Sequence, residues 1–178
     1  MSNPHPPELA AATAHPLTLR GEPVVARLVM PVSSRNLVFH AIDIRRPERA
    51  LVSVDNIEAA ENPGVAYGVF VGSGDGTEPE SYLNVGAISL FGVEMRDDTT
   101  VRHDEAPGFR QIFDATTSLQ LLAGQGGWDA GAMNVRFELI LPLPPTGRES
   151  LVQPLIEEQR AAAAQMPVTI GRVGLFVY

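Results

Sequence analysis

Apolar residues recur at every second position over most of the chain, which is the spacing of a β-strand with one buried face. The pattern is clearest in "MNVRFELILPLP" (133–144), where Val135, Phe137 and Leu139 alternate with polar residues. The stretch "SYLNVGAISLFGVEMRD" (81–97) predicts a buried strand, a glycine kink and a polar exit. Similar alternation predicts further strands over residues 23–30, 36–44, 50–58, 65–72, 109–117 and 167–178.

Helical spacing is convincing only in "ESLVQPLIEEQRAAAAQ" (149–165). Its alanine run favours a helix, and Pro154 suits the first turn. After the strand at 109–117 we expect one short helical turn, capped by Thr117 or Ser118. Because turn signals separate the strands and no βαβ alternation occurs, the predicted fold class is all-β. We expect an antiparallel β-sandwich of about eight strands with one inserted helix near 150–165.

The first residues differ in composition from the rest of the chain. "MSNPHPPELAAATAHP" holds four prolines among alanine and polar residues. This composition is typical of a segment without regular structure. We therefore expect residues 1–22 to form a flexible N-terminal arm and residues 23–178 to form a single β-sandwich domain.

Composition narrows the function classes. The 178 residues include no cysteine, which excludes disulfides, zinc–thiolate sites and a thiol nucleophile. A net charge of −8 disfavours nucleic acid and anionic membranes as partners. The start of the sequence lacks the basic and apolar regions of a secretory signal. The expected location is therefore cytoplasmic, with co-export alongside a partner as an alternative.

Candidate catalytic residues are few. The sequence has four histidines, and none forms an H-x-H or H-x-x-x-H pair. A metal site would have to bring together His40, His103 and a carboxylate from distant positions; the alternative is a packed His40 and a solvated His103. Asp114 lies before a turn, where its carboxylate is expected to bond local backbone N–H groups. Ser89 lacks the G-x-S-x-G context of a hydrolase nucleophile.

Three aromatic residues next to loops or glycines are candidates for partner binding: Tyr82, Phe109 and Trp128. In a sandwich most aromatic residues belong to the core. An aromatic residue that a loop holds outward can instead fill a pocket on a partner, where such anchors contribute most to affinity. Trp128, within a glycine-rich loop, is also a candidate platform for a sugar ring.

Several segments, taken in order, resemble the C-terminal β-sandwich domain of the tyrosinase and polyphenol oxidase (type-3 copper) family. "VGAISLFGVE" (85–94) resembles that domain's G-x-[IV]-S-L-F-G strand, and "VTIGRVGLFVY" (168–178) resembles its terminal [IV]-x-[IV]-G-R-V pattern. The segments at 50–72, 113–122 and 133–142 are similar to the remaining parts in the same order. The likeness covers about residues 24–178.

The resemblance implies a role without catalysis. In the family, the C-terminal domain packs over the copper site and can place a bulky residue in the substrate pocket. This sequence lacks the copper-binding histidines of the catalytic domain, so the resemblance implies that the chain binds no cofactor and that copper belongs to a partner. The leading hypothesis is thus a free-standing, non-catalytic module that acts in trans as a subunit, lid or maturation partner of a type-3 copper oxidase. Tyr82 and Phe109 are candidates for the pocket-filling residue.

Two other hypotheses stay open. One is a metal-binding protein or enzyme that uses His40 and His103 with nearby carboxylates. The other is a generic interaction or carbohydrate-binding sandwich, centred on Trp128. The sequence does not identify the partner, and it leaves open whether the chain forms a homo-oligomer or is a fragment of a longer protein.

Overall fold

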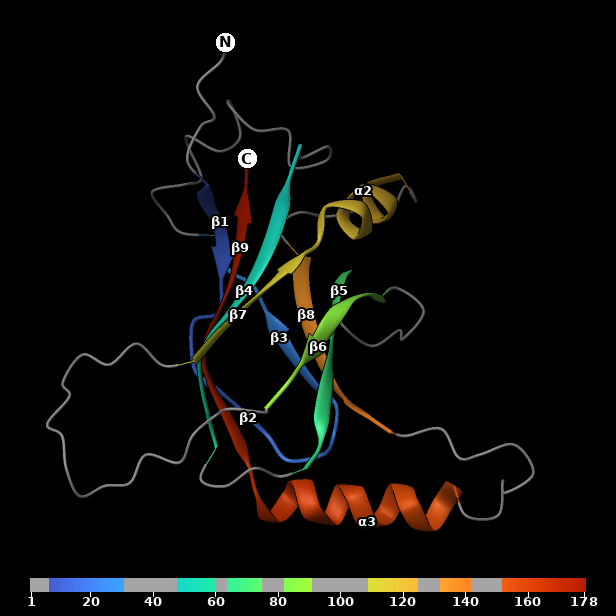
Figure 1. Cartoon of the computed structure of the whole chain (residues 1–178). Helices are drawn as coiled ribbons and strands as arrows, with labels where there is room; N and C mark the ends of the chain where they lie inside the picture. Colours follow the sequence, from blue (N-terminus) through green and yellow to red (C-terminus); the bar gives the residue numbers. More distant parts are fainter. Residues whose placement is uncertain are drawn as a thin grey trace, which may run out of the picture.

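The computed structural model describes residues 7–30, 48–59, 64–74, 82–90, 109–124, 132–141 and 152–178. The strand expected at 36–44 lies outside these residues. The described part holds nine strands and two helices, named as in Figure 1. The strands are β1 (Glu8–Ala12), β2 (Leu17–Leu19), β3 (Val24–Arg27), β4 (Ala50–Ala59), β5 (Ala66–Ser73), β6 (Tyr82–Ile88), β7 (Phe109–Asp114), β8 (Met133–Ile140) and β9 (Val168–Val177), and the helices are α2 (Thr116–Gly124) and α3 (Val152–Gln165).

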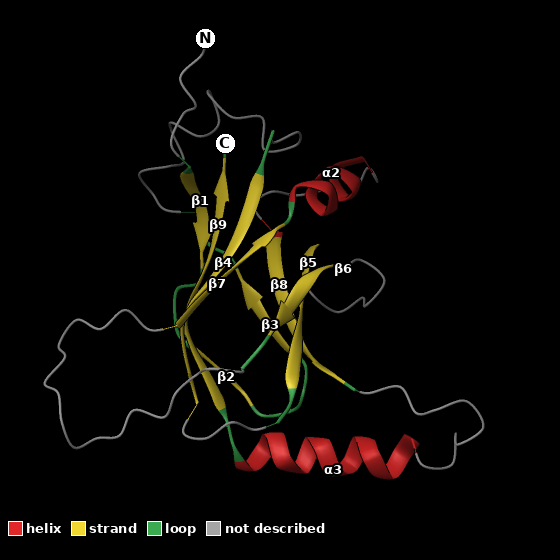
Figure 2. Cartoon of the chain, in the orientation of Figure 1, coloured by secondary structure: helices red, strands yellow, loops and turns green. Residues whose placement is uncertain are grey.

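The strands form two antiparallel sheets, which we call sheet A and sheet B. Sheet A has the order β1-β9-β4-β7, with β2 also paired to β9, and sheet B has the order β3-β8-β5-β6. Figure 2 shows the sheets as two layers of strands. The predicted all-β sandwich is confirmed, and α3 between β8 and β9 is the inserted helix expected near 150–165. Helix α2 has nine residues, more than the single turn that was expected.

The core lies between the inner faces of the two sheets. On sheet A, Val52 and Val54 of β4 point inward and are fully buried. On sheet B, Phe137 of β8 pairs with Val69 of β5, and both are fully buried. Alternate positions along the same strands face outward, as the period of two predicts. The outer faces of both sheets are therefore built from every second residue of the same strands.

A bulge interrupts the alternation of β4. Its register against β7 shifts between Val54 and Ile57, and Asn56 has a positive φ of 55°. This conformation is one that asparagine tolerates better than most residues. The extra residue places Ile57 in the core, where simple alternation would have placed Asn56. Gly171 of β9 lies against this bulge, since a Cβ there would come within 2.7 Å of the Asn56 Cβ.

Both lateral edges of the sandwich carry contacts between the sheets. At one edge, Ala12 of β1 and Val29, just after β3, exchange backbone hydrogen bonds of 3.0 and 2.8 Å. At the other edge, the Gln111 side chain of β7 bonds the backbone of Ser89, donating through Nε2 at 2.6 Å and accepting through Oε1 at 3.2 Å. β6 is thus an edge strand of sheet B. The prediction of a buried strand there is wrong, because Ile88 is the only buried residue between Tyr82 and Ile88.

The two helices lie at opposite ends of the sandwich (Figure 1). Helix α2 buries Leu119 and Leu122. Helix α3 buries Ala163 and packs close to Gly21, where a Cβ would lie 3.2 Å from the Ala163 Cβ. The Gly21 N–H in turn donates a buried hydrogen bond of 3.1 Å to the hydroxyl of Tyr67 in β5. Neither described helix has the length and hydrophobicity that crossing a membrane requires.

The expected flexible arm at 1–22 is contradicted over most of its length. Glu8–Ala12 and Leu17–Leu19 both form strands that pair with β9. Ala10, Ala11 and Leu19 are buried in the core. The proline and alanine content suggested an arm, but small alanine side chains at the sheet edge pack as core residues. The boundary placed at residue 22 is therefore wrong.

Candidate functional site

The structure describes two of the five residues named as site candidates. Tyr82 is the first residue of β6 in sheet B, and Phe109 is the first residue of β7 in sheet A. The Gln111–Ser89 contact places the start of β7 near the end of β6, so the two aromatic residues lie at opposite ends of that edge. Trp128, His40 and His103 lie outside the described residues. Within the described ranges, no three His, Asp or Glu side chains gather as metal ligands would.

Phe109 is the more exposed of the two aromatic candidates. It pairs with Ile57 across β4 and β7, and its exposed fraction is 38%. It begins β7, which is an edge strand among the described strands of sheet A and has β4 as its neighbour there. A bulky apolar side chain is thus held at the rim of a rigid sheet. Other large apolar residues that are also exposed are Val25, Val29, Ile112, Leu121 and Ile140.

Tyr82 is part of a cluster on the outer face of sheet B. The guanidinium of Arg136 in β8 lies 5.6 Å from the centre of the Tyr82 ring. The same guanidinium forms an ion pair of 3.1 Å with Glu138, two residues further along β8. The Arg136 side chain is only 17% exposed, whereas that of Glu138 is 45% exposed. A cation is thus held between an aromatic ring and a carboxylate on the sheet surface.

Phe70 lies next to this cluster. It is the direct cross-strand partner of Arg136, and its ring extends over Gly68. A Cβ at Gly68 would come within 2.7 Å of the Phe70 Cε2, so glycine leaves room for the ring to lie there. This part of the outer face of sheet B therefore combines two aromatic rings with the Arg136 guanidinium, a composition that is enriched where proteins bind one another.

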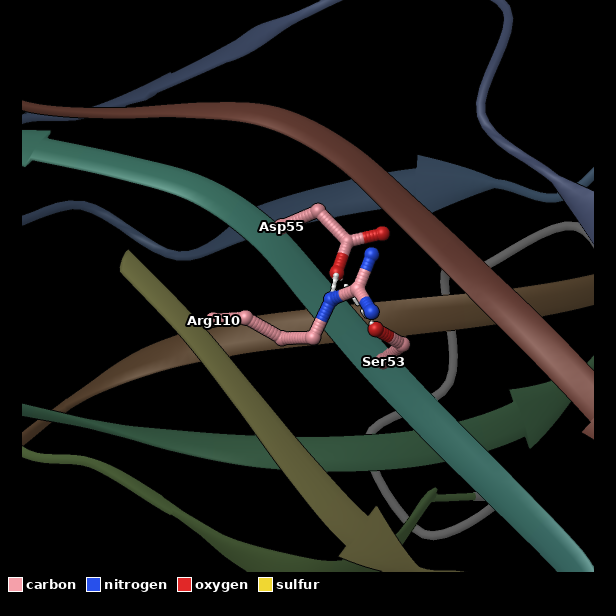
Figure 3. A network of polar contacts seen from close by, with 3 residues as sticks. All are labelled: Ser53, Asp55 and Arg110. Atoms are coloured by element: carbon pink, nitrogen blue, oxygen red, sulfur yellow. Dashed lines mark hydrogen bonds and ion pairs between the residues drawn. The ribbon is translucent and has the colours of Figure 1, made fainter. Parts of the chain in front are cut away.

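The outer face of sheet A carries a second polar cluster, which Figure 3 shows. Asp55 of β4 accepts hydrogen bonds from the hydroxyl of Ser53 and from Nε of Arg110 in β7. Asp55 and Arg110 also form an ion pair, in which the side chains are 13% and 62% exposed. An ion pair with one exposed partner contributes about 0–1 kcal/mol. The cluster links β4 to β7 beside the bulge and has a structural role.

Ser53 lacks the features of a nucleophile. It is 3% exposed, and its hydroxyl proton is donated to a carboxylate that Arg110 also holds. Nucleophilic serines are activated by an adjacent base that is itself oriented by a third group, and their oxygen must reach the substrate. Asp55 is an adjacent base that Arg110 orients, but the second condition is not met, because the buried Ser53 oxygen is not accessible to a substrate.

Asp114 has the capping role that the sequence predicted. Its Oδ1 accepts hydrogen bonds from the Thr116 N–H at 2.9 Å and from the Thr116 hydroxyl at 2.6 Å. These bonds hold the pKa of the Asp114 carboxyl below its usual value. Ala115 accepts the first helical bond, from Leu119 N–H, but has no side chain that can cap. The cap of α2 therefore comes from Asp114, and the helix begins before the predicted Thr117 or Ser118.

We expect Asp114→Ala to lower the free energy of unfolding by about 1 kcal/mol, the usual cost of losing a helix cap. Asp114→Asn keeps an acceptor oxygen and should cost less. Because the pKa is lowered in the fold, the stabilisation by the charge is present above pH ~4 and is lost as the pH falls through the folded pKa. Urea unfolding of both variants at neutral and acidic pH measures this. An equal loss for Asn and Ala would contradict the capping role.

Sequence reasoning missed Arg136 and Arg110, since attention went to histidines, serines and aromatic residues. A signal for Arg136 was available, because Arg136 and Glu138 are two residues apart in a predicted strand and must share one face. Its contact with Tyr82 was not predictable, because that contact depends on how β5 aligns with both β8 and β6. The ion pair of Arg110 with Asp55 was not predictable either, because Asp55 lies just before a bulge that the sequence did not predict.

Comparisons with known proteins add a family and distant structural neighbours. A family model described as "Domain of unknown function (DUF7868)" matches residues 6–177. No curated protein matches the sequence. Among solved structures, recombinantly expressed latent aurone synthase (polyphenol oxidase) is similar with a TM-score of 0.44 and 14% identity, over 93% of this chain and 26% of that chain. Latent aurone synthase from natural source is similar with a TM-score of 0.41 and 14% identity, over 89% and 24%. The chain thus spans about a quarter of the length of these oxidase chains.

Proposed function

This chain belongs to the DUF7868 family of domains of unknown function, and we propose that it is a non-catalytic module that binds a type-3 copper oxidase chain in trans. It acts as a subunit, lid or maturation partner, and the copper belongs to the partner. The rim of sheet A, where Phe109 lies, is the part that covers the partner's active site. The observation that carries the proposal is the exposure of Phe109 at the start of an edge strand.

Two lines of support meet at this residue. The ordered sequence segments resemble the domain that covers the copper site in tyrosinases and polyphenol oxidases, and the sandwich that those segments predicted is the fold of this chain. In addition, a large aromatic side chain at 38% exposure on a paired strand can enter a pocket with less loss of conformational entropy than one on a loop. Burial of such an anchor is the main source of affinity in many interfaces.

Phe109 suits the pocket-filling role better than Tyr82. The Tyr82 ring is already engaged by Arg136 on the outer face of sheet B. To enter a partner's pocket, Tyr82 would have to leave a cation–π contact with a largely buried guanidinium, worth roughly 1–2 kcal/mol. Phe109 begins β7, next to the segment of the chain that carries the charged sequence "MRDDTTVRHDEAPG" (95–108). A partner can bury the exposed part of Phe109 without breaking a cation–π contact among the described residues.

Co-expression with the tyrosinase-like chain encoded nearest to this one tests the proposal. We expect the two chains to co-elute in size-exclusion chromatography, and the oxidase to turn over catechol at an altered rate in the complex. Phe109→Ala should weaken the complex by at least about tenfold, since a buried aromatic anchor contributes ~2 kcal/mol or more. Leu121→Ala is the control, because Leu121 is also a large apolar residue and is more exposed than Phe109, at 55%, on α2.

The proposal fails if the chains do not co-elute and the oxidase rate is unchanged. It also fails if the purified chain oxidises phenols unaided. Elution of this chain alone as a dimer that excludes the oxidase would favour self-association instead. Thermal unfolding of Phe109→Ala shows whether any loss of binding comes from loss of fold.

A further inference from the structure

The guanidinium of Arg136 has a hydrogen-bond donor that none of its described neighbours accepts. The Arg136 side chain is 17% exposed, and its Nε is buried with no hydrogen-bond acceptor among the residues that the structure describes. The ion pair with Glu138 uses the other end of the guanidinium, at Nη2. Holding a guanidinium away from water is costly unless acceptors replace the lost hydration. A further acceptor that reached this group would therefore be bound more strongly than at a hydrated surface arginine.

The surface around Arg136 is partly apolar. Its cross-strand neighbours are Val25 on β3, which is 41% exposed, and Phe70 on β5. Ile140, on the same face of β8, is 43% exposed. A segment that lay across sheet B could thus place apolar side chains on Val25 and Ile140 while one of its polar groups reached Arg136.

The charge of this face is opposite to that of the whole chain. Arg27 of β3 and Arg136 of β8 point outward from sheet B, and Glu138 of β8 is the acidic residue on the outer face of the same two strands, whereas the chain carries a net charge of −8. Arginine and tyrosine, which meet here as Arg136 and Tyr82, are also among the residue types that most often dominate the binding energy of interfaces. Charge complementarity therefore favours an acidic group as the occupant, and the flanking apolar residues favour a protein segment.

We infer that the outer face of sheet B, centred on Arg136 and bordered by Val25, Phe70 and Tyr82, binds an acidic segment of a partner protein, whose carboxylate bonds the Arg136 guanidinium. This rests on the proposed function only in that the chain binds a partner protein. Glu138 competes for the same guanidinium, so the partner carboxylate either replaces it or shares Arg136 with it. Tyr82 holds the arginine side chain in place and is a positioning residue.

Titration of the ¹⁵N-labelled full chain with a probe peptide tests the inference by NMR. The probe alternates glutamate and leucine and is blocked at both ends; its control carries glutamine in place of glutamate. We expect shifts of amides on β8, β5 and β6 and of the Arg136 side-chain N–H, which weaken as salt is added. Equal shifts with the glutamine peptide would overturn the inference. So would the same shifts with the neutral sugar maltose, which would make the face a carbohydrate platform.

Two substitutions in the cluster should act in opposite directions. Arg136→Gln should weaken binding of the glutamate peptide about tenfold, the loss of one charge-assisted hydrogen bond. Glu138→Gln removes the competing carboxylate and should strengthen binding roughly two- to fivefold. Arg110→Gln on sheet A makes the same charge change as Arg136→Gln and should leave binding unaltered. The inference is contradicted if Arg110→Gln weakens peptide binding as much as Arg136→Gln does. It is also contradicted if Glu138→Gln weakens peptide binding, and this outcome can be read even if Arg136→Gln folds poorly.

Failure of this inference is distinguishable from failure of the proposed function. If the oxidase chain co-elutes and Arg136→Gln does not weaken the complex, the partner binds elsewhere and only the inference fails. If the glutamate peptide binds at Arg136 and the oxidase chain does not co-elute, the acidic partner is another protein and the proposed function fails.

Discussion

Gly86→Ala is expected to lower the free energy of unfolding by about 3 kcal/mol, from backbone strain and overlap together. Gly86 lies in β6 with φ of 155°, a conformation that L-residues rarely adopt. A Cβ there would overlap the Phe113 ring of β7, with Cε1 only 2.9 Å away and Cδ1 closer. The ring is partly buried and packs against the core, so moving it away would cost core contacts. The substitution therefore forces apart the two strands at this edge.

The two contributions can be separated experimentally. Gly64→Ala is the control without overlap, because Gly64 has a positive φ, of 65°, in the less costly left-handed region, and nothing described lies within 4 Å of a Cβ built there. It should cost about 1–2 kcal/mol from strain alone. In the double variant Gly86→Ala with Phe113→Leu, the smaller side chain should recover part of the loss, a coupling between residues in contact. Chemical unfolding measures the native chain, Gly64→Ala, Gly86→Ala, Phe113→Leu and the double variant. Full additivity of the two substitutions would contradict the overlap.

This edge matters for the proposed function because it positions both described aromatic candidates. Phe109 begins β7 and Tyr82 begins β6, and the edge between them is held by the Phe113–Gly86 contact and the Gln111–Ser89 hydrogen bonds. A partner that buried Phe109 would meet a rim fixed from both sheets. Loosening it by Gly86→Ala should weaken partner binding even where the chain remains folded.

The fold was predictable from the sequence because it follows from local alternation. In β8, Val135, Phe137 and Leu139 are buried and Arg136 faces outward, as the period of two predicts. The alternation failed where the backbone departs from an extended strand. Asn56 takes a positive φ, and the resulting bulge brings Ile57 into the core. Asparagine followed by isoleucine in a strand, as at Asn56 and Ile57, does not indicate whether the strand forms a bulge or pairs regularly.

The candidate site was less predictable, because its contacts join residues from different strands. Tyr82 was singled out as an aromatic residue near a loop, but the contact that engages it comes from Arg136, two strands away in sheet B. Strand order and register decide which outward side chains become neighbours, and alternation fixes only the face. Asp114 was predictable because its role is local: the acceptor and the donors on Thr116 are two residues apart.

Tyr67→Phe is expected to destabilise the fold by about 1–3 kcal/mol, the cost of leaving a buried N–H without an acceptor. The Tyr67 hydroxyl accepts the 3.1 Å hydrogen bond from Gly21, and both residues are buried. Gly21 has a positive φ of 91° and lies against α3, close to the Arg160 carbonyl and Ala163. The Tyr67 hydroxyl thus links the inner face of β5 to the turn at Gly21, which packs against α3. Hydrogen exchange should therefore speed up in α3 more than in α2 in this variant.

The same hydroxyl makes the fold sensitive to alkaline pH. Burial raises the pKa of Tyr67 above its usual value of 10.0, and the hydrogen bond from Gly21 lowers it by less. Since the pKa is higher in the fold than in the unfolded chain, the stabilisation is complete below pH ~10 and is lost as the pH rises towards the folded pKa, by at most about 1.4 kcal/mol per pH unit. Urea unfolding from pH 8 to 11.5 should show this decline in the native sequence and in Tyr178→Phe, but much less of it in Tyr67→Phe. A decline of equal slope in Tyr67→Phe would assign alkaline unfolding to other groups, and the buried hydroxyl would then be no more than a hydrogen-bond acceptor for the turn beneath α3.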